Sequence, residues 1–439
     1  MKQIILSLLI LASLFTQELN GFVEYAISPR LLKNTGISNT KDYVINESRI
    51  QLKYEHSSDE GELFFKVDFI NDNVLNTTSL KVREAYFTAT PFEWLDIKLG
   101  RQIQTWGVGD LMFINDVFQK DWISFFSGRS DEYLKTASDA IRLTAYPEML
   151  GIEAFDLSIM PNSQSDINIQ TEGRFRSVNP IFAAYISSGI TINNTLPTAN
   201  AQKNAEFALR IKLKNIAGFT PSLYAYKGRW NNPYSMLFDG ISQITPFFSK
   251  LNVYGGSLRG QTLGGILSLE TGFYDSRDDK NGDNPLIENS SFRFLALFET
   301  SLTTTLDLGI QYYSEIIQDY DKIEDGFNNP VGFADKDGMR DEVRGLFTLR
   351  LTQKLLNETL WLTWFSYFSP TDEDYFFRPR VKYEYSDNIR FIFTANIFDA
   401  FGDNNDKRKS SNGFPDYHNT MFGQFNKDKN INFTFRYIF

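Results

Sequence analysis

The sequence predicts an all-β fold: a transmembrane antiparallel β-barrel of about 18 strands, with about 16 strands as the alternative. Three observations support this class. Segments of alternating polar and apolar residues recur along the 439 residues, short and long connections alternate between them, and the last segment alternates up to a terminal Phe439. Because successive side chains of a strand point to opposite faces, this alternation predicts strands with one apolar and one polar face.

Residues 430–439 (NINFTFRYIF) show the alternation most clearly. Their odd-numbered positions are all apolar, and their even-numbered positions are polar except Ile438. An apolar strand edge in water risks aggregation, whereas in a membrane barrel lipid covers the apolar face and the first strand covers the edge. Bacterial outer-membrane barrels typically end on such a strand, so we interpret Phe439 as an assembly signal for the barrel-assembly machinery.

The composition suits a barrel wall and excludes several classes of protein. Aromatic residues make up 15% of the chain, with 40 Phe and 21 Tyr, as expected for lipid-facing walls and interfacial girdles. The mean hydropathy of −0.30 argues against a helical membrane protein, and the net charge of −10 argues against nucleic acid as a partner. With no cysteine, and with only His56 and His418, we expect no metal site, no cofactor and no enzyme activity.

Residues 1–21 are typical of a secretory signal peptide. Lys2 precedes an apolar run from Ile4 to Phe15, and polar residues follow that run. No small-x-small triplet precedes Phe22, and the alternative is a membrane-anchor helix, for which the apolar run is too short. We therefore expect residues 22–439 to form a single barrel domain in the bacterial outer membrane.

The lengths of the connections give an independent indication of the barrel's orientation. The tight turns are predicted at residues 91–92, 147–151, 215–218, 259–261, 354–357 and 386–388. The long loops between them are predicted at residues 106–138, 161–203, 228–249, 276–290, 315–340 and 400–429. Outer-membrane barrels have short periplasmic turns and long extracellular loops, so an even strand number places both termini in the periplasm.

Residues 82–107 (VREAYFTATPFEWLDIKLGRQIQTWG) carry a pattern of short motifs. An R-E-A-Y strand is followed by L-G-R-Q, by W-G, and then by Asn115-Asp116. This arrangement resembles a large family of porin-like proteins of Gram-negative outer membranes, whose substrates are mostly unassigned. Residues 341–360, 369–383 and 422–439 also look like that family, whereas the resemblance covers residues 161–337 poorly.

The resemblance implies an outer-membrane channel for the passive diffusion of small solutes and says little about which solutes pass. The family often has Asn-Pro-x-Asp after the Asn-Asp pair, whereas this chain has Gln119-Lys120-Asp121, which leaves the shape of that loop open. The alternative is a non-conducting barrel, either a surface-binding protein or the outer-membrane partner of an export system. A homotrimer is common among diffusion porins, but no residue here decides it. We expect the acidic loop segments 275–283, 319–326 and 401–407 to be solvated tips, with divalent ions as bridges to lipopolysaccharide.

The inner wall of the barrel is predicted to be basic. Assigning the apolar face of each strand to lipid directs twelve basic side chains into the lumen. They are Lys53, Lys66, Arg142, Arg210, Lys212, Arg344, Arg350, Arg378, Arg380, Lys382, Arg390 and Arg436. The acids on the same strands are fewer, namely Glu55, Glu62, Asp68, Glu206, Glu342 and Glu384. Basic rings favour anions in a pore. The alternative is that these bases pair with the acids and only stiffen the wall.

Residues 106–138 are the third loop on the long-loop side if the predicted strand order holds, and they are a candidate constriction loop by analogy with general porins. The residues that we expect to contribute are Trp106, Asp110, Asn115, Asp116 and Asp121. The alternative is an ordinary surface loop, and the sequence also leaves open whether residues 161–203 fold into the lumen. On the preceding strand, Arg101 has the parity of the lipid-facing residues. It would meet lipid phosphates there, unless a bulge at Gly100 turns it inward.

Overall fold

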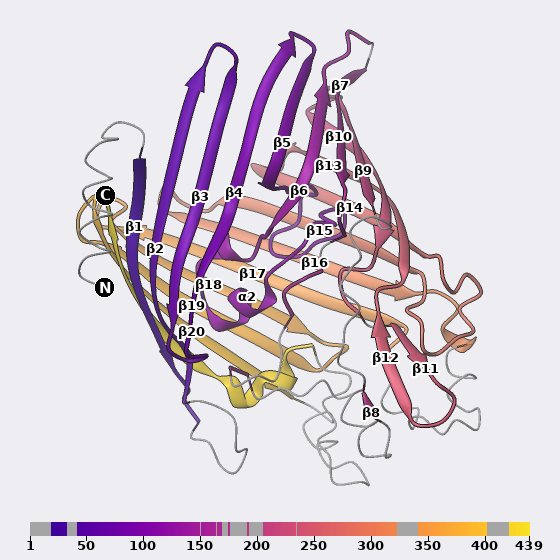
Figure 1. Cartoon of the computed structure of the whole chain (residues 1–439). Coiled ribbons are helices and arrows are strands. Elements are labelled where there is room, and N and C mark those ends of the chain that lie inside the picture. The colour runs from indigo at the N-terminus through magenta and orange to yellow at the C-terminus, as the bar shows by residue number, and fades with distance from the viewer. Residues whose placement is uncertain are drawn as a thin grey trace.

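The computed structural model describes residues 19–32, 42–149, 151–163, 165–168, 174–175, 191–192, 205–233, 235–322, 341–401 and 421–439. Eighteen antiparallel strands form one sheet that closes on itself, because β1 pairs with both β2 and β21. The all-β barrel and the larger of the two predicted strand numbers are therefore confirmed (Figure 1).

Each barrel strand pairs with its sequence neighbours in the wall. The barrel strands are β1 (Leu19–Pro29), β2 (Tyr43–Ser58), β3 (Gly61–Asp72), β4 (Thr77–Phe92), β5 (Leu95–Ile103), β6 (Ala137–Ala145), β7 (Ile152–Met160), β9 (Glu206–Leu213), β10 (Phe219–Arg229), β13 (Lys250–Thr262), β14 (Gly265–Ser276), β15 (Ser291–Ser301), β16 (Leu306–Ile317), β17 (Val343–Leu355), β18 (Leu360–Ser369), β19 (Asp374–Glu384), β20 (Ile389–Ala400) and β21 (Asn430–Ile438). A separate small sheet contains β8 (Thr191–Ile192), β11 (Ser235–Phe238) and β12 (Gln243–Phe247).

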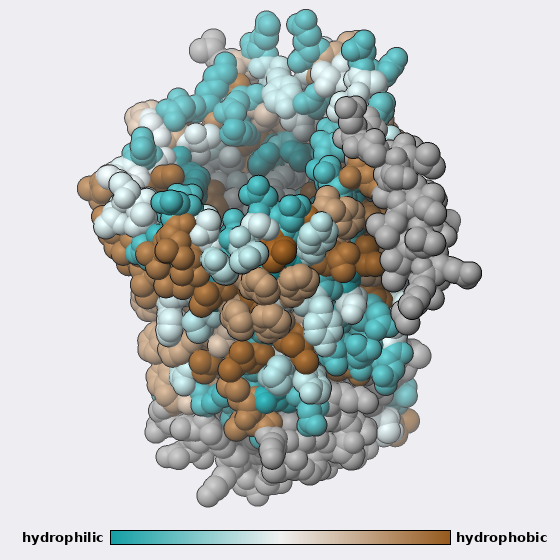
Figure 2. Space-filling model, turned by 90° about the vertical axis from the view of Figure 1, so that its left-hand side faces the viewer, coloured by the Kyte–Doolittle hydropathy of each residue, from teal (hydrophilic) through white to brown (hydrophobic). Residues whose placement is uncertain are grey.

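The strands keep the alternation that the sequence predicts. In β18, for example, Leu362 and Trp364 are exposed on the outer face, whereas Phe365 and Tyr367 are buried inside the barrel. Such outward residues form the hydrophobic belt that crosses the middle of Figure 2. Hydrophilic residues lie above that belt in the same view, around a recess that opens near the top. The wall thus has the apolar outer band that lipid requires.

The connections separate into two rims. The short-turn rim includes the turns at residues 59–60, 93–94 and 263–264, and the long-loop rim lies at the other end, where β5 and β20 end and β6 and β21 begin. Two connections on the long-loop rim are nevertheless short, at residues 73–76 and 370–373.

Several predicted details are wrong. The turn predicted at residues 259–261 lies within β13, and the chain turns two residues later, at Leu263 and Gly264, where both residues have a positive φ. The predicted turn at residues 91–92 likewise lies at the end of β4. Glu342 precedes β17 and is exposed, so it is not an inner-wall acid. The alternation of β4 and β13 continues through residues that favour turns, whereas β17 begins only after Glu342.

The first strand begins at Leu19, three residues before the predicted mature start, and Gly21 pairs with Leu52 of β2. Residues 1–18, which hold most of the predicted signal peptide, lie outside the described residues. No helix among the described residues is both long and apolar enough to cross a membrane.

The buried apolar core lies inside the barrel. Residues 104–136, which we call the inner loop, leave the wall after β5 and carry helix α2 (Trp122–Ser127) into the interior (Figure 1). Phe125 and Phe126 of α2 pack against Phe376 and Phe398 of the opposite wall. The structure therefore answers the question that the sequence left open: the loop folds into the barrel. Most of residues 161–203 lies outside the described residues.

Candidate functional site: the barrel interior

The inner loop folds around a short capped helix. Asp121 precedes α2, and its carboxylate accepts hydrogen bonds from the Ser124 backbone N–H at 2.8 Å and from the Ser124 hydroxyl at 2.7 Å. Gly128 ends the helix with a φ of 87°, and its N–H donates to the carbonyl of Phe125. Asp121, a predicted constriction residue, therefore acts as a helix cap, which is a structural role.

One attachment of the inner loop is to β14. The buried Glu270 carboxylate accepts hydrogen bonds from the backbone N–H of Val108 at 2.7 Å and of Asn115 at 2.7 Å, and from the Asn115 side-chain amide at 3.0 Å. Gly255 and Gly272 lie beneath this contact, and a Cβ on either glycine would overlap the side chain of Asn115 or Ile114. Asn115, another predicted constriction residue, thus holds the loop to the wall.

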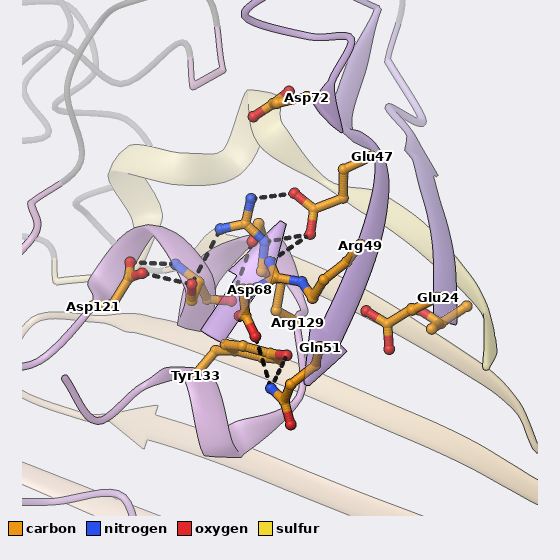
Figure 3. Close-up of polar contacts among 12 residues, drawn as sticks. Glu24, Glu47, Arg49, Gln51, Asp68, Asp72, Asp121, Arg129 and Tyr133 are labelled. Atoms are coloured by element: carbon orange, nitrogen blue, oxygen red, sulfur yellow. Dashed lines mark hydrogen bonds and ion pairs between the residues drawn. The ribbon is translucent and has the colours of Figure 1, made fainter. Parts of the chain in front are cut away.

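A second attachment is a buried ion network on β2 and β3 (Figure 3). Arg129 of the inner loop binds Glu47 with both ends of its guanidinium group, at 3.0 and 2.5 Å. Arg49 bridges Glu47 at 2.9 Å and Asp68 at 2.5 Å, and its guanidinium lies 4.2 Å from the ring centroid of Tyr133. Burial alone would lower the pKa of Arg129, but the charge of Glu47 outweighs it and raises that pKa above its ordinary value.

The third attachment faces the opposite wall, where three arginines meet two loop carboxylates. Arg350 binds Asp110 in a bidentate pair at 2.6 and 2.8 Å. Arg378 donates to Asp131 at 2.7 Å, and Arg380 approaches the same carboxylate at 3.4 Å. We call these five residues the arginine cluster. Partial burial alone would raise the pKa of Asp131, but the guanidinium groups of Arg378, Arg380 and Arg350 hold it below its ordinary value.

Each of the twelve predicted basic residues has a carboxylate partner within 3.4 Å. The pairing of bases with acids, which was the alternative to a purely basic lumen, is therefore present. Arg142 and Arg210 share Asp156, whereas Lys382 and Arg390 share Glu384. The remaining pairs are Lys53–Glu55, Lys66–Glu84, Lys212–Glu153, Arg344–Asp372 and Arg436–Glu24. Their role in lining a pore stays a prediction.

The remaining constriction candidates differ in accessibility. Trp106 is buried edge-on against Phe118, with ring centroids 5.1 Å apart. Asp116 is buried and pairs with Lys120 at 3.1 Å. Asp110 keeps a partly exposed carboxylate within the arginine cluster. Among the five candidates, Asp110 is therefore the one whose charge a solute in the lumen would meet.

Sequence reasoning missed further inner-wall bases, three of them on β13, β15 and β17. Arg259 pairs with Glu299 at 2.9 Å, Arg293 with Glu315 at 2.8 Å, and Lys354 with Asp307 at 3.3 Å. Arg259 and Lys354 fell in predicted turns, and β15 is apolar on both faces around Arg293, so parity gave no direction there. Extending the period of two through residues 259 and 354 would have found two of the three.

A cavity of about 300 Å³ lies between the inner loop and β13. Trp106, Phe113, Lys135 and Arg259 are among its lining residues, so an apolar surface and two cations meet there. Within the described residues, no group of three or more His, Cys, Asp or Glu side chains is placed to hold a metal ion.

On the outer face, Arg101 has the direction that its parity predicts. Its guanidinium donates to both carboxylate oxygens of Asp139 on β6, at 2.8 Å each. The β4–β5 register runs without a shift from Ala85 to Ala89, so no bulge at Gly100 turns Arg101 inward. The partner is a neighbouring side chain, which the sequence reading did not consider.

Comparison with known proteins supports the fold. No protein-family model matches the chain, and no curated protein matches it. OccAB4 of Acinetobacter baumannii aligns with a TM-score of 0.53 and 9% identity over 96% of this chain and 97% of that one. OccK10 (OpdN) of Pseudomonas aeruginosa aligns with a TM-score of 0.50 and 10% identity over 96% and 98%. A triple mutant of the Rhodopseudomonas blastica porin aligns with a TM-score of 0.41 and 9% identity over 96% and 99%. The chain thus shares its closed β-barrel fold with OccAB4 and OccK10.

Proposed function

We propose that the protein is an outer-membrane channel through which small solutes diffuse passively, with a preference for anions. The arginine cluster carries this proposal. Three guanidinium groups face two carboxylates, which leaves one uncompensated positive charge where the inner loop approaches β17 and β19. Arg350 and Arg380 also keep 28% and 22% of their side chains exposed, so their charge remains accessible to a solute.

The test is the reversal potential of the purified, refolded protein in a planar bilayer under a salt gradient. We expect anion preference for the wild type, and a shift toward cations for Arg380→Gln, because that variant removes the uncompensated charge. Arg277→Gln is the matched control, since Arg277 lies on the long-loop rim beyond β14 and pairs there with Asp275. Cation preference in the wild type, or equal shifts in both variants, would contradict the anion proposal.

The second candidate is a non-conducting barrel, either a surface-binding protein or the partner of an export system. The observation that favours it is the aromatic contact of Phe125 and Phe126 with the opposite wall, which fills part of the interior. A correctly folded, heat-modifiable barrel that gives no conductance would favour this candidate over the channel.

Export and assembly complete the proposal. We infer that residues 1–21 direct the chain to the periplasm, and that the assembly machinery recognises the last strand. Phe439 exchanges two backbone hydrogen bonds of 3.0 Å with Gly21 of β1, so it lies at the seam that closes the wall. Phe439→Ala should slow assembly in cells, and unchanged amounts of folded barrel would contradict this role. The outer belt would then contact membrane lipid, and the loops would contact lipopolysaccharide.

A further inference from the structure

A small cavity lies inside the barrel, next to the seam where β1 meets β21. Its volume is about 30 Å³, and residues of β1, β19, β20 and β21 contribute to its lining. Residues 128–130 of the inner loop, directly after α2, complete that lining. We call this space the seam cavity. It exceeds the roughly 10–15 Å³ that one water molecule needs, so it has room for water or for one monoatomic ion.

The lining includes a hydrogen-bond donor without a partner. Asn432 of β21 is buried, with 1% of its surface exposed. Its side-chain oxygen accepts a hydrogen bond from the Thr434 hydroxyl at 2.8 Å, whereas its side-chain nitrogen has no partner among the described residues. Buried N–H groups are almost always paired, because an unpaired one has lost its hydrogen bonds to water. Whatever occupies the seam cavity must therefore accept a hydrogen bond.

The charged residues around the seam cavity are mostly basic. Its described lining includes three arginines, Arg129, Arg380 and Arg436, and one carboxylate, Glu24. Glu24 lies on the strand next to the ion network of β2 and β3 (Figure 3), and it binds Arg436 at 2.6 Å. Arg129 is bound to Glu47 within that network. Of the three arginines, Arg380 is therefore the one whose pairing decides the charge of the cavity.

Arg380 is the least closely paired of these arginines. Both of its contacts with Asp131 measure 3.4 Å, whereas Arg378 reaches the same carboxylate at 2.7 Å. The Nε of Arg380 donates to the Thr394 hydroxyl at 3.3 Å, which supplies no charge. A guanidinium group in a low-dielectric interior is costly unless an anion pairs with it closely. The seam cavity therefore combines an unpartnered donor with a weakly compensated positive charge.

A monoatomic anion meets both requirements, because it accepts hydrogen bonds from several directions and brings the negative charge that Arg380 lacks. The arginines repel a metal cation, a sulfate or phosphate is too large for the space, and a water molecule brings no charge. We propose that the seam cavity binds one halide ion, chloride under ordinary conditions, between the Asn432 amide and the Arg380 guanidinium. The ion connects residues 128–130 to β19 and β21, and it thereby fixes the end of α2.

Bromide provides a direct test, because it resembles chloride in size and charge and scatters X-rays anomalously. Crystals of the refolded protein are grown in sodium bromide, and we expect one anomalous peak in the seam cavity, within hydrogen-bond distance of the Asn432 side-chain nitrogen. Asn432→Asp keeps the shape of the side chain but places a carboxylate there, so we expect the peak to be lost. Asn289→Asp is the matched control and should keep the peak, since Asn289 is a buried amide on the long-loop rim that already donates to the Gln318 carbonyl at 3.0 Å.

The second measurement is the urea midpoint of unfolding when chloride replaces gluconate at constant sodium concentration. An ion that binds only the folded barrel stabilises it in proportion to its occupancy. We expect the midpoint to rise with chloride in the wild type and in Asn289→Asp, and to stay unchanged in Asn432→Asp. If Asn432→Asp does not fold, the bromide peak and the chloride dependence of the wild type still decide the question.

Two results would overturn the proposal. Density for water alone in the bromide crystals, together with a midpoint that ignores chloride, would show that the cavity is only hydrated. A peak that persists in Asn432→Asp would show that the amide donor is not a ligand and that the ion is adventitious. Bound chloride would lower the net charge of the arginine cluster, but neither measurement uses conductance. Failure of this proposal is therefore distinguishable from failure of the channel proposal.

Discussion

The inner loop is held at two opposite walls by the same chemistry in two different environments. On the β2–β3 side, Glu47 is 1% exposed and Asp68 is 0% exposed, and their partners Arg49 and Arg129 are buried and largely buried, respectively. In the arginine cluster, Asp131 keeps one third of its side chain accessible. Removing water strengthens both the pairing energy and the cost of an unpaired charge. The buried pairs on the β2–β3 side therefore hold the inner loop in place, whereas the partly exposed pairs of the arginine cluster contribute an electrostatic field to the lumen.

The largest expected effect is on stability, from Glu47→Ala. This change removes the carboxylate that Arg49 and Arg129 share, so Arg49 keeps only Asp68 and the largely buried Arg129 loses the carboxylate of its ion pair. We expect the free energy of unfolding to fall by roughly 3–5 kcal/mol, as for other buried pairs that lose one partner. Urea titration of the barrel in detergent, followed by tryptophan fluorescence, measures the change.

Glu55→Ala is the matched control for that comparison. Glu55 pairs with Lys53 on the same strand, but both side chains are more than one third exposed. We expect a change within about 0.5 kcal/mol. If the two variants lost equal stability, burial would not be what distinguishes the two kinds of pair.

The next effect is on selectivity, from Asp131→Asn. The variant keeps the shape of the side chain but removes the charge that Arg378 and Arg380 share. We expect the reversal potential to move further toward anions, opposite in sign to the shift from Arg380→Gln. Asp307→Asn, at the pair with Lys354 near the short-turn rim, serves as the control. A shift toward cations, or one no larger than the control's, would place the selective field elsewhere.

The smallest effect is expected from pH. Because the pKa of Asp131 is held below its ordinary value of about 3.9, the carboxylate is fully ionised above about pH 4. Its contribution to stability and charge is present there and is lost only as pH falls through the lowered pKa. The difference in reversal potential between wild type and Asp131→Asn should therefore persist from pH 8 down to about pH 3, where an ordinary aspartate is mostly protonated. A difference that was lost between pH 5 and pH 3 would show that Asp131 titrates like a solvated acid.

The wall could be predicted from the sequence because each strand repeats one local rule. Alternation in residues 430–439 identified a strand whose observed bounds, Asn430–Ile438, differ from the prediction by one residue. The prediction failed where a strand continues through residues that favour turns, as at Arg259, and where both faces are apolar, as around Arg293. Around Arg293 both faces of the strand are apolar, so the alternation does not show which side chains point into the barrel.

The interior could be predicted only in part, because its contacts join residues that are far apart in the chain. Asp110 is 240 residues from Arg350, and Asn115 is 155 residues from Glu270. No local pattern distinguishes a loop that packs inside the barrel from one that covers its rim. The sequence named Asp110, Asn115 and Asp121 as candidates, but only the fold separates the exposed carboxylate from the anchor and the helix cap.

The seam between β1 and β21 has a consequence for how long the protein survives. Six residue pairs close the ring, from Phe22–Ile438 to Ile27–Phe433, and they join the first and last strands of the wall. Closing a contact between strands so far apart in the chain carries a large cost in loop-closure entropy, so we expect it to come late in folding. Once closed, no strand can leave without breaking the ladders on both of its sides at once. The lifetime of the folded barrel is therefore set by the height of the barrier to opening, so its durability is kinetic.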